Sequence, residues 1–145
     1  MHSLSRWLGA AAAGLTLSIV LTESLLALLV MMGAGEHLLW AVTRPTAAAS
    51  MAPAWLAVIW LGAATASGAL ATAMAGHASA AIPVAAFPVA SLGLVAWYFR
   101  QPALVGTMLV LGPVLGCMLG MMLGTTLQRL DHSEASTVPT PGAEI

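Results

Sequence analysis

Polar and apolar residues divide this chain into four long apolar runs, separated by short polar or proline-rich stretches. The pattern predicts helices over about 7–32, 53–75, 80–99 and 103–127. Each run approaches or exceeds the roughly 20 apolar residues that a helix needs to cross a hydrocarbon core about 30 Å thick. We therefore predict an all-α integral membrane bundle of four transmembrane helices within residues 1–127. A short disordered polar tail is predicted over residues 128–145.

The ends of the runs carry residues typical of a lipid–water boundary. Trp7 opens the first run, and Trp97, Tyr98 and Arg100 close the third. Arg6 before an apolar run also imitates a secretory signal, but the run continues well beyond the 7–15 residues, roughly, of a signal's apolar region. We therefore predict a first span that is retained.

Composition supports a membrane protein and excludes several other classes. Hydrophobic residues make up 60% of the chain and charged residues only 6%, with a mean hydropathy of +0.96, whereas soluble domains carry about 25% charged residues. The net charge of −1, without a cluster of basic residues, excludes nucleic acid as a partner. A single cysteine, Cys117, excludes an internal disulfide and any metal site built from several cysteines.

The arginines do not set an orientation in the membrane. Four spans place both ends of the chain on one side, with Arg6 and Arg129 there and Arg44 and Arg100 on the other side. The bias of basic residues that normally fixes topology is therefore tied. We expect a multi-pass protein of the bacterial cytoplasmic (inner) membrane.

Small residues recur every fourth position in two of the runs, which places them along one face of a helix. In the second run Gly68 belongs to such a series. Small residues at this spacing allow two membrane helices to approach closely. The sequence thus predicts helix packing through Gly68 and through a glycine ladder in the fourth run: Gly112, Gly116, Gly120 and Gly124.

Glu23 is the only ionisable residue within the first run. A carboxylate at that depth costs about 2.5–3.5 kcal/mol, so we expect it to face protein or water. Thr16 lies on the same helix face, seven residues earlier, whereas a separate stripe has the spacing of a packing seam: Gly14, Ser18 and Thr22. Two interpretations stay open. Glu23, with Thr16, is a proton or substrate site lining a cavity, or it is a protonated carboxyl that holds the bundle together through a hydrogen bond to a neighbouring helix.

Other candidate chemistry is weak. Glu36 and His37 are interfacial polar residues, which mark either the mouth of a cavity or plain surface anchors. His37 and His77 fall on opposite sides of the predicted bundle, so they cannot share one haem. No pair has metal-site spacing, no glycine-rich phosphate loop occurs, and the serine, histidine and aspartate residues are too few for a hydrolase. We expect no enzymatic activity, no catalytic residue, no cofactor and no metal.

Four short helices with a lone glutamate in the first, and no bias of basic residues, resemble the small multidrug resistance exporters. The resemblance implies an antiparallel dimer in which Glu23 binds drug or protons. The segment from 33 to 52 is longer than in that family, and the tryptophans here cluster at the span ends, so the resemblance is one of architecture.

Residues Pro53 to Leu123 are similar to a group of small, uncharacterised bacterial four-helix membrane proteins. Shared features are a glycine-rich second span, from Leu61-Gly62 to Ala75-Gly76, and a fourth span that starts after Gln101-Pro102 and contains a proline and glycines. This resemblance implies a fold and no activity.

Two functions follow as expectations. The first is a non-enzymatic accessory or assembly partner that packs through glycine-rich helix faces. The alternative is a small dimeric proton-coupled transporter that uses Glu23 as its proton or substrate site. The expected partners are the lipid bilayer and either a second copy of the chain or other membrane proteins. The two functions differ in whether Glu23 must ionise.

Overall fold

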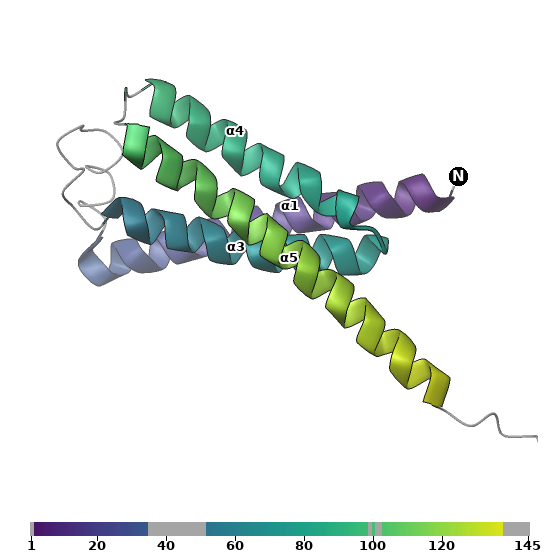
Figure 1. Ribbon diagram of the computed structural model, residues 1–145. Coiled ribbons are helices and arrows are strands. Elements are labelled where there is room, and N and C mark those ends of the chain that lie inside the picture. Colours follow the sequence, from purple (N-terminus) through teal and green to yellow (C-terminus); the bar gives the residue numbers. More distant parts are fainter. Residues whose placement is uncertain (1, 35–51, 99, 101–102, 138–145) are drawn as a thin grey trace, which may run out of the picture.

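The computed structural model describes residues 2–34, 52–98, 100 and 103–137 of the chain (Figure 1). These residues form no strand, and their four long helices are α1 (His2–Leu29), α3 (Ala52–Ala75), α4 (Ile82–Tyr98) and α5 (Ala103–Thr137). A π-helical turn, η1 (Val30–Ala34), follows α1, and a 3-10 turn, η3 (Ala78–Ala81), precedes α4. Four helical stretches are long and apolar enough to cross a bilayer, which confirms the all-α prediction and is compatible with a multi-pass membrane protein.

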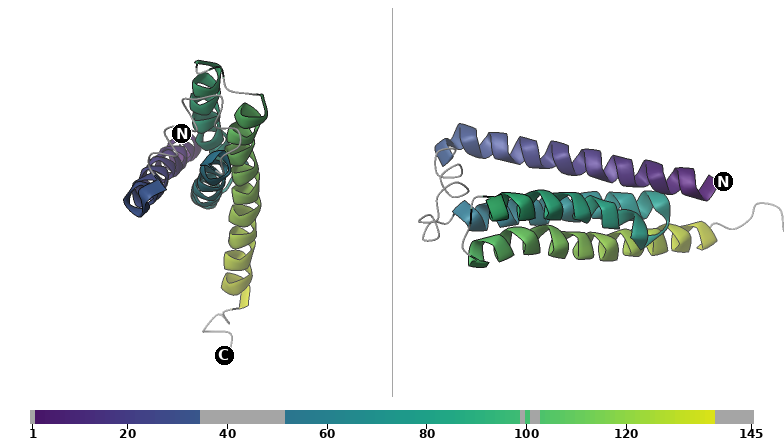
Figure 2. Two further views of the ribbon diagram at one scale, coloured as in Figure 1. Left: turned by 90° about the vertical axis from the view of Figure 1, so that its left-hand side faces the viewer. Right: turned by 90° about the horizontal axis from the view of Figure 1, so that it is seen from above.

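The helix α3 is the centre of the arrangement. Successive helices alternate in direction, so the start of α1 and the end of α5 lie at the same end of the bundle (Figure 1). Viewed along the bundle, α1 and α5 flank α3, and α4 lies beside α5 (Figure 2). The central position of α3 is reflected in its burial. In the most apolar stretch of α3, 44% of the residues are buried, against 11% in that of α1.

Two clusters of buried residues hold the helices together. One lies where α3 and α5 begin, and its members are Leu56, Val105 and Leu109. The other lies near the start of α1 and the end of α3, and it consists mainly of alanine: Ala10, Ala71, Ala75, Ala80 and Val84. Small side chains at the second cluster let the helix backbones approach closely.

The fourth helix is longer than the sequence predicted. We expected it to end at Leu127 and the disordered tail to start at 128, but α5 continues to Thr137. Residues 128–137 contain neither proline nor glycine, so nothing in them interrupts a helix. The Gln128 side chain also fastens this turn to α3, because its Nε2 donates hydrogen bonds of 2.8 and 3.2 Å to the carbonyls of Thr72 and Ala73. The rest of the predicted tail, residues 138–145, lies outside the described residues.

Gly76 ends α3 in a left-handed conformation. Its φ is +80°, and its N–H donates a 3.0 Å hydrogen bond to the carbonyl of Thr72, four residues earlier. This is the usual glycine cap at a helix C-terminus, which gives one orphan carbonyl a partner.

Gly76→Ala is expected to destabilise the fold by about 1–2 kcal/mol, the cost of holding an L-residue in the left-handed region. No atom lies within 4 Å of a Cβ at this position, so the cost is purely conformational. Gly62→Ala is the matched control, because its Cβ also meets open space but its backbone is right-handed helix. It should stabilise by up to about 1 kcal/mol. Unfolding of the purified protein in mixed detergent micelles measures both, and equal effects would contradict the role of the cap.

Candidate functional site

Glu23 and Thr16 lie on the exposed outer face of α1. The two residues are seven positions apart, which corresponds to about 10 Å along the helix axis, so they share a face without touching. The Oγ1 of Thr16 donates a 3.0 Å hydrogen bond to the carbonyl of Ala12 in its own helix. The structure therefore keeps both candidate residues on one surface but does not bring them together.

The opposite face of α1 carries the contact with the rest of the bundle. Ser18 and Thr22 are buried there, and Gly14 lies at the closest approach. A Cβ at Gly14 would lie 2.8 Å from Cγ2 of Val84 and 3.0 Å from the carbonyl oxygen of Ser67. The small-residue stripe thus takes the inward position, since only small side chains permit this approach.

It follows that Glu23 points away from the interior of its own chain. The stripe and Glu23 lie on different sides of α1, so turning the stripe inward turns the carboxyl outward. In a bilayer, one chain alone would present Glu23 to lipid, at a cost of about 2.5–3.5 kcal/mol. A cavity or hydrogen-bond partner for this carboxyl has to come from outside the described helices.

The glycine ladder of α5 lies directly against the backbone of α3. A Cβ would lie 2.7 Å from the carbonyl oxygen of Ala57 if built at Gly112, and 2.5 Å from that of Thr65 if built at Gly120. Gly116 and Gly124 meet α3 in the same way. Gly68 differs from these four, because a Cβ there would make an ordinary contact of 3.4 Å with the carbonyl of Cys117.

Two side chains make contacts with the C-terminal end of α3 that the sequence did not predict. The last carbonyls of a helix have no partner within it and attract cations. The Nε of Arg6 donates a 2.7 Å hydrogen bond to the carbonyl of Met74, and Gln128 donates to the two carbonyls before it. The local sequence does not predict these contacts, because the donors are far from their acceptors along the chain. Arg6 is 68 residues from Met74, and Gln128 is 55 residues from Ala73.

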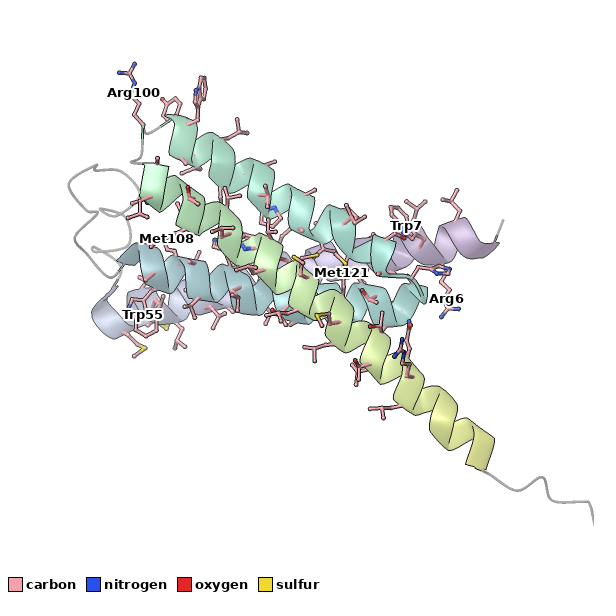
Figure 3. The ribbon with its side chains drawn as sticks, in the orientation of Figure 1. Arg6, Trp7, Trp55, Arg100, Met108 and Met121 are labelled. Atoms are coloured by element: carbon pink, nitrogen blue, oxygen red, sulfur yellow. The ribbon has the colours of Figure 1, made fainter. Side chains whose placement is uncertain are left out.

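Arg6 and Arg100 lie at opposite ends of the bundle. Figure 3 shows Arg6 and Trp7 at the end where α3 joins α4, and Arg100 at the opposite end. The Nε1 of Trp7 donates a 3.2 Å hydrogen bond to Oγ of Ser79. Arg100 has a φ of 47° and follows the end of α4. Basic and amphipathic aromatic residues at both ends are the pattern of membrane boundaries.

Grooves along α4 contain few polar side chains. One of about 510 Å³ between α4 and α5 includes Trp97 and Thr107 in its lining, and one of about 460 Å³ includes Trp97 and Arg100. A smaller groove of about 280 Å³ between α4 and α5 is lined by apolar residues, among them Ala85, Val89 and Met121. No three histidine, cysteine, aspartate or glutamate side chains come together as a metal site among the residues that the structure describes. Glu36 and His37 lie outside the described residues.

Comparison of the chain with protein-family models, with curated proteins and with solved structures finds no match. Function therefore has to be argued from the chain's own surfaces. The most informative of them is the outer face of α1, defined here by Gly9, Ala13, Thr16, Val20, Glu23 and Ala27.

Proposed function

We propose that this chain is a multi-pass protein of the bacterial cytoplasmic membrane, without enzymatic activity, that serves as an accessory or assembly partner of membrane proteins. Its four apolar helices, with Arg6 at one end of the bundle and Arg100 at the other, support the membrane location. The bacterial inner membrane is proposed from the resemblance to small bacterial four-helix proteins. In this proposal the working surface is the outer face of α1.

One observation carries the proposal, namely the exposed position of Glu23. Polar groups in a bilayer are stable only when protein or water covers them, and the bundle itself leaves this carboxyl uncovered. Only 11% of the residues in the most apolar stretch of α1 are buried, so this helix has a free face to offer. A protein partner on the outer face of α1 would remove the carboxyl from lipid.

The glycine ladder has a different role in this proposal. Gly112, Gly116, Gly120 and Gly124 already lie against α3, so we assign the ladder to packing within the chain. Small residues that are still free would let a partner helix approach closely. Gly9 meets this requirement, since no atom lies within 4 Å of a Cβ built there, and it shares the outer face with Glu23.

A dimeric proton-coupled transporter is the second candidate, and the same exposed carboxyl favours it. A partner chain on the outer face of α1 would enclose Glu23 in a shared site. Such a transporter needs Glu23 to release and take up a proton, whereas an assembly contact needs only its hydrogen bonds. Glu23→Gln separates the two, because the amide keeps hydrogen bonding and cannot ionise.

The proposal is tested by photo-crosslinking in living cells. A benzophenone amino acid at Val20, on the outer face of α1, is expected to form adducts with protein. The same amino acid at Leu94, on the exposed face of α4, is expected to react with lipid. Glu23→Leu should lower the protein adduct at least several-fold, and Glu23→Gln should preserve it. Lipid adducts alone at Val20 would contradict the proposal. Proton uptake into vesicles that is lost in Glu23→Gln would replace it with the transporter.

A further inference from the structure

We infer that the outer face of α1 binds a second copy of this chain, with the two α1 helices parallel and the two Glu23 carboxyls hydrogen-bonded to each other. This inference rests on the proposed function, in that it names the partner of the same surface. It goes further by fixing the stoichiometry, the direction of the helices and the atoms in contact.

Depth in the membrane favours a second copy. Two parallel chains related by a two-fold axis along the membrane normal place every residue opposite its own equivalent. Glu23 therefore meets another Glu23 at the same depth, whatever that depth is. A different protein would have to bring a polar group to this level independently.

The hydrogen-bonding capacity of a carboxyl also favours a second copy. A protonated carboxyl carries one O–H donor and keeps acceptor capacity on its oxygens. Two such groups satisfy each other: each O–H donates to the other's carbonyl oxygen, and no counter-ion is needed. The described arginines lie near the ends of helices. Arg6 is close to the start of α1, Arg100 follows α4, and Arg129 follows the apolar part of α5, whereas Glu23 lies within α1.

The shape of the surface suits a pair of parallel helices. Gly9, Thr16 and Glu23 recur at seven-residue intervals, with Ala13, Val20 and Ala27 four residues after each. This alternation of three and four residues is the spacing of a left-handed helix pair. Small residues dominate its first half, which lets the two backbones approach. Figure 2 shows α1 at the edge of the bundle, with this side open among the described helices.

Disulfide formation in purified protein tests the inference. Cys117, the one cysteine, is buried, and Cys117→Ala gives a cysteine-free background. Thr16→Cys and Ala27→Cys are introduced separately, with Leu94→Cys on α4 as the control, and each protein is oxidised in phosphatidylcholine vesicles. A disulfide needs Cα atoms about 4.4–6.8 Å apart. We expect at least tenfold more covalent dimer at positions 16 and 27 than at 94. In the Thr16→Cys protein, Glu23→Leu should lower the yield several-fold and Glu23→Gln should not.

Each other outcome has a defined meaning. Positions 16 and 27 are about 16 Å apart along the axis, so cross-linking at both requires parallel helices. A further variant, Val20→Cys, tests for the opposite direction. Efficient cross-linking at position 20, without cross-linking at 16 and 27, would indicate an antiparallel pair and would overturn the inference. A dimer yield at 16 and 27 no higher than at 94, or one indifferent to Glu23→Leu, would overturn it as well. If purified protein forms no dimer while Val20 in cells captures a protein of another size, the inference fails and the proposed function stands. If the photo-reactive amino acid at Val20 forms adducts only with lipid in cells, both the inference and the proposed function are contradicted.

Discussion

Gly120→Leu is expected to drive α5 away from α3 and to prevent the native bundle from forming. A Cβ at this position would lie 2.5 Å from the carbonyl oxygen of Thr65 and 2.8 Å from the backbone nitrogen of Ala69. Both atoms belong to the main chain of α3, so no side-chain rotation can make room. Even the single methyl group of Gly120→Ala should cost about 1–3 kcal/mol, the usual range for overpacking.

Gly106→Ala is the matched control on the same helix. Its Cβ would make an ordinary contact of 3.5 Å with Cβ of Ala96, on α4. Gly68→Ala, on the α3 side of the ladder, should likewise be tolerated. Unfolding in mixed micelles, followed by circular dichroism, measures all three alanine variants. If Gly120→Ala proved no less stable than Gly106→Ala, the close contact of α5 with α3 would be wrong.

Gly14→Leu is expected to release α1 from the rest of the bundle. The contact of α1 is narrow, and a Cβ at Gly14 would already lie 2.8 Å from Val84 and 3.0 Å from Cβ of Ala71. The larger side chain cannot enter without separating the helices, and the hydrogen bond from Arg6 to Met74 would be lost with the contact. Ala10, one turn before Gly14, is buried in the same contact and would be exposed by the same separation.

The labelling rate of a buried thiol on α1 measures whether α1 separates from the rest of the bundle. Ser18→Cys in the Cys117→Ala background places the thiol at a position whose side chain is 2% exposed. Maleimide labelling of this thiol in detergent should be slow in the parent protein and at least tenfold faster when Gly14→Leu is added. Gly9→Ala, on the outer face of the same helix, is the control and should leave the rate unchanged. An equally slow rate in Gly14→Leu would show that α1 is held by other contacts.

Hydropathy predicted the four long helices of the described residues, because runs of about 20 apolar residues have few alternatives to a spanning helix. Most of their boundaries were also predicted, although α1 begins at His2, five residues before the predicted start. The end of α5 was not predictable in the same way. Hydrogen bonds from Gln128 to the carbonyls of Thr72 and Ala73 stabilise this turn of α5. The donor and its acceptors are 56 and 55 residues apart, so a short stretch of sequence cannot predict them. Polar composition after 127 therefore suggested a tail where the structure has helix.

The position of Glu23 illustrates a second limit. Helical periodicity separated the face of Thr16 and Glu23 from the stripe of Gly14, Ser18 and Thr22, but periodicity only relates residues to one another. Which face turns inward depends on the surface that α3 and α4 present, above all Ser67 and Val84. The same limit applies to the glycine ladder of α5. The sequence shows its four-residue spacing but does not show that the ladder packs against α3.

The two donors to the end of α3, Arg6 and Gln128, are synthesised at different times, so the contacts around α3 can form only in a certain order. Arg6 is synthesised long before Met74, but Gln128 follows Thr72 by 56 residues. While the chain grows from its N-terminus, α1 is therefore ready to bind α3 as soon as α3 appears. The second side chain reaches α3 only after the ribosome has passed the whole of α4 and most of α5. The side of α3 that receives the glycines stays uncovered until α5 has been made, so other helices or chaperones can bind it in the meantime.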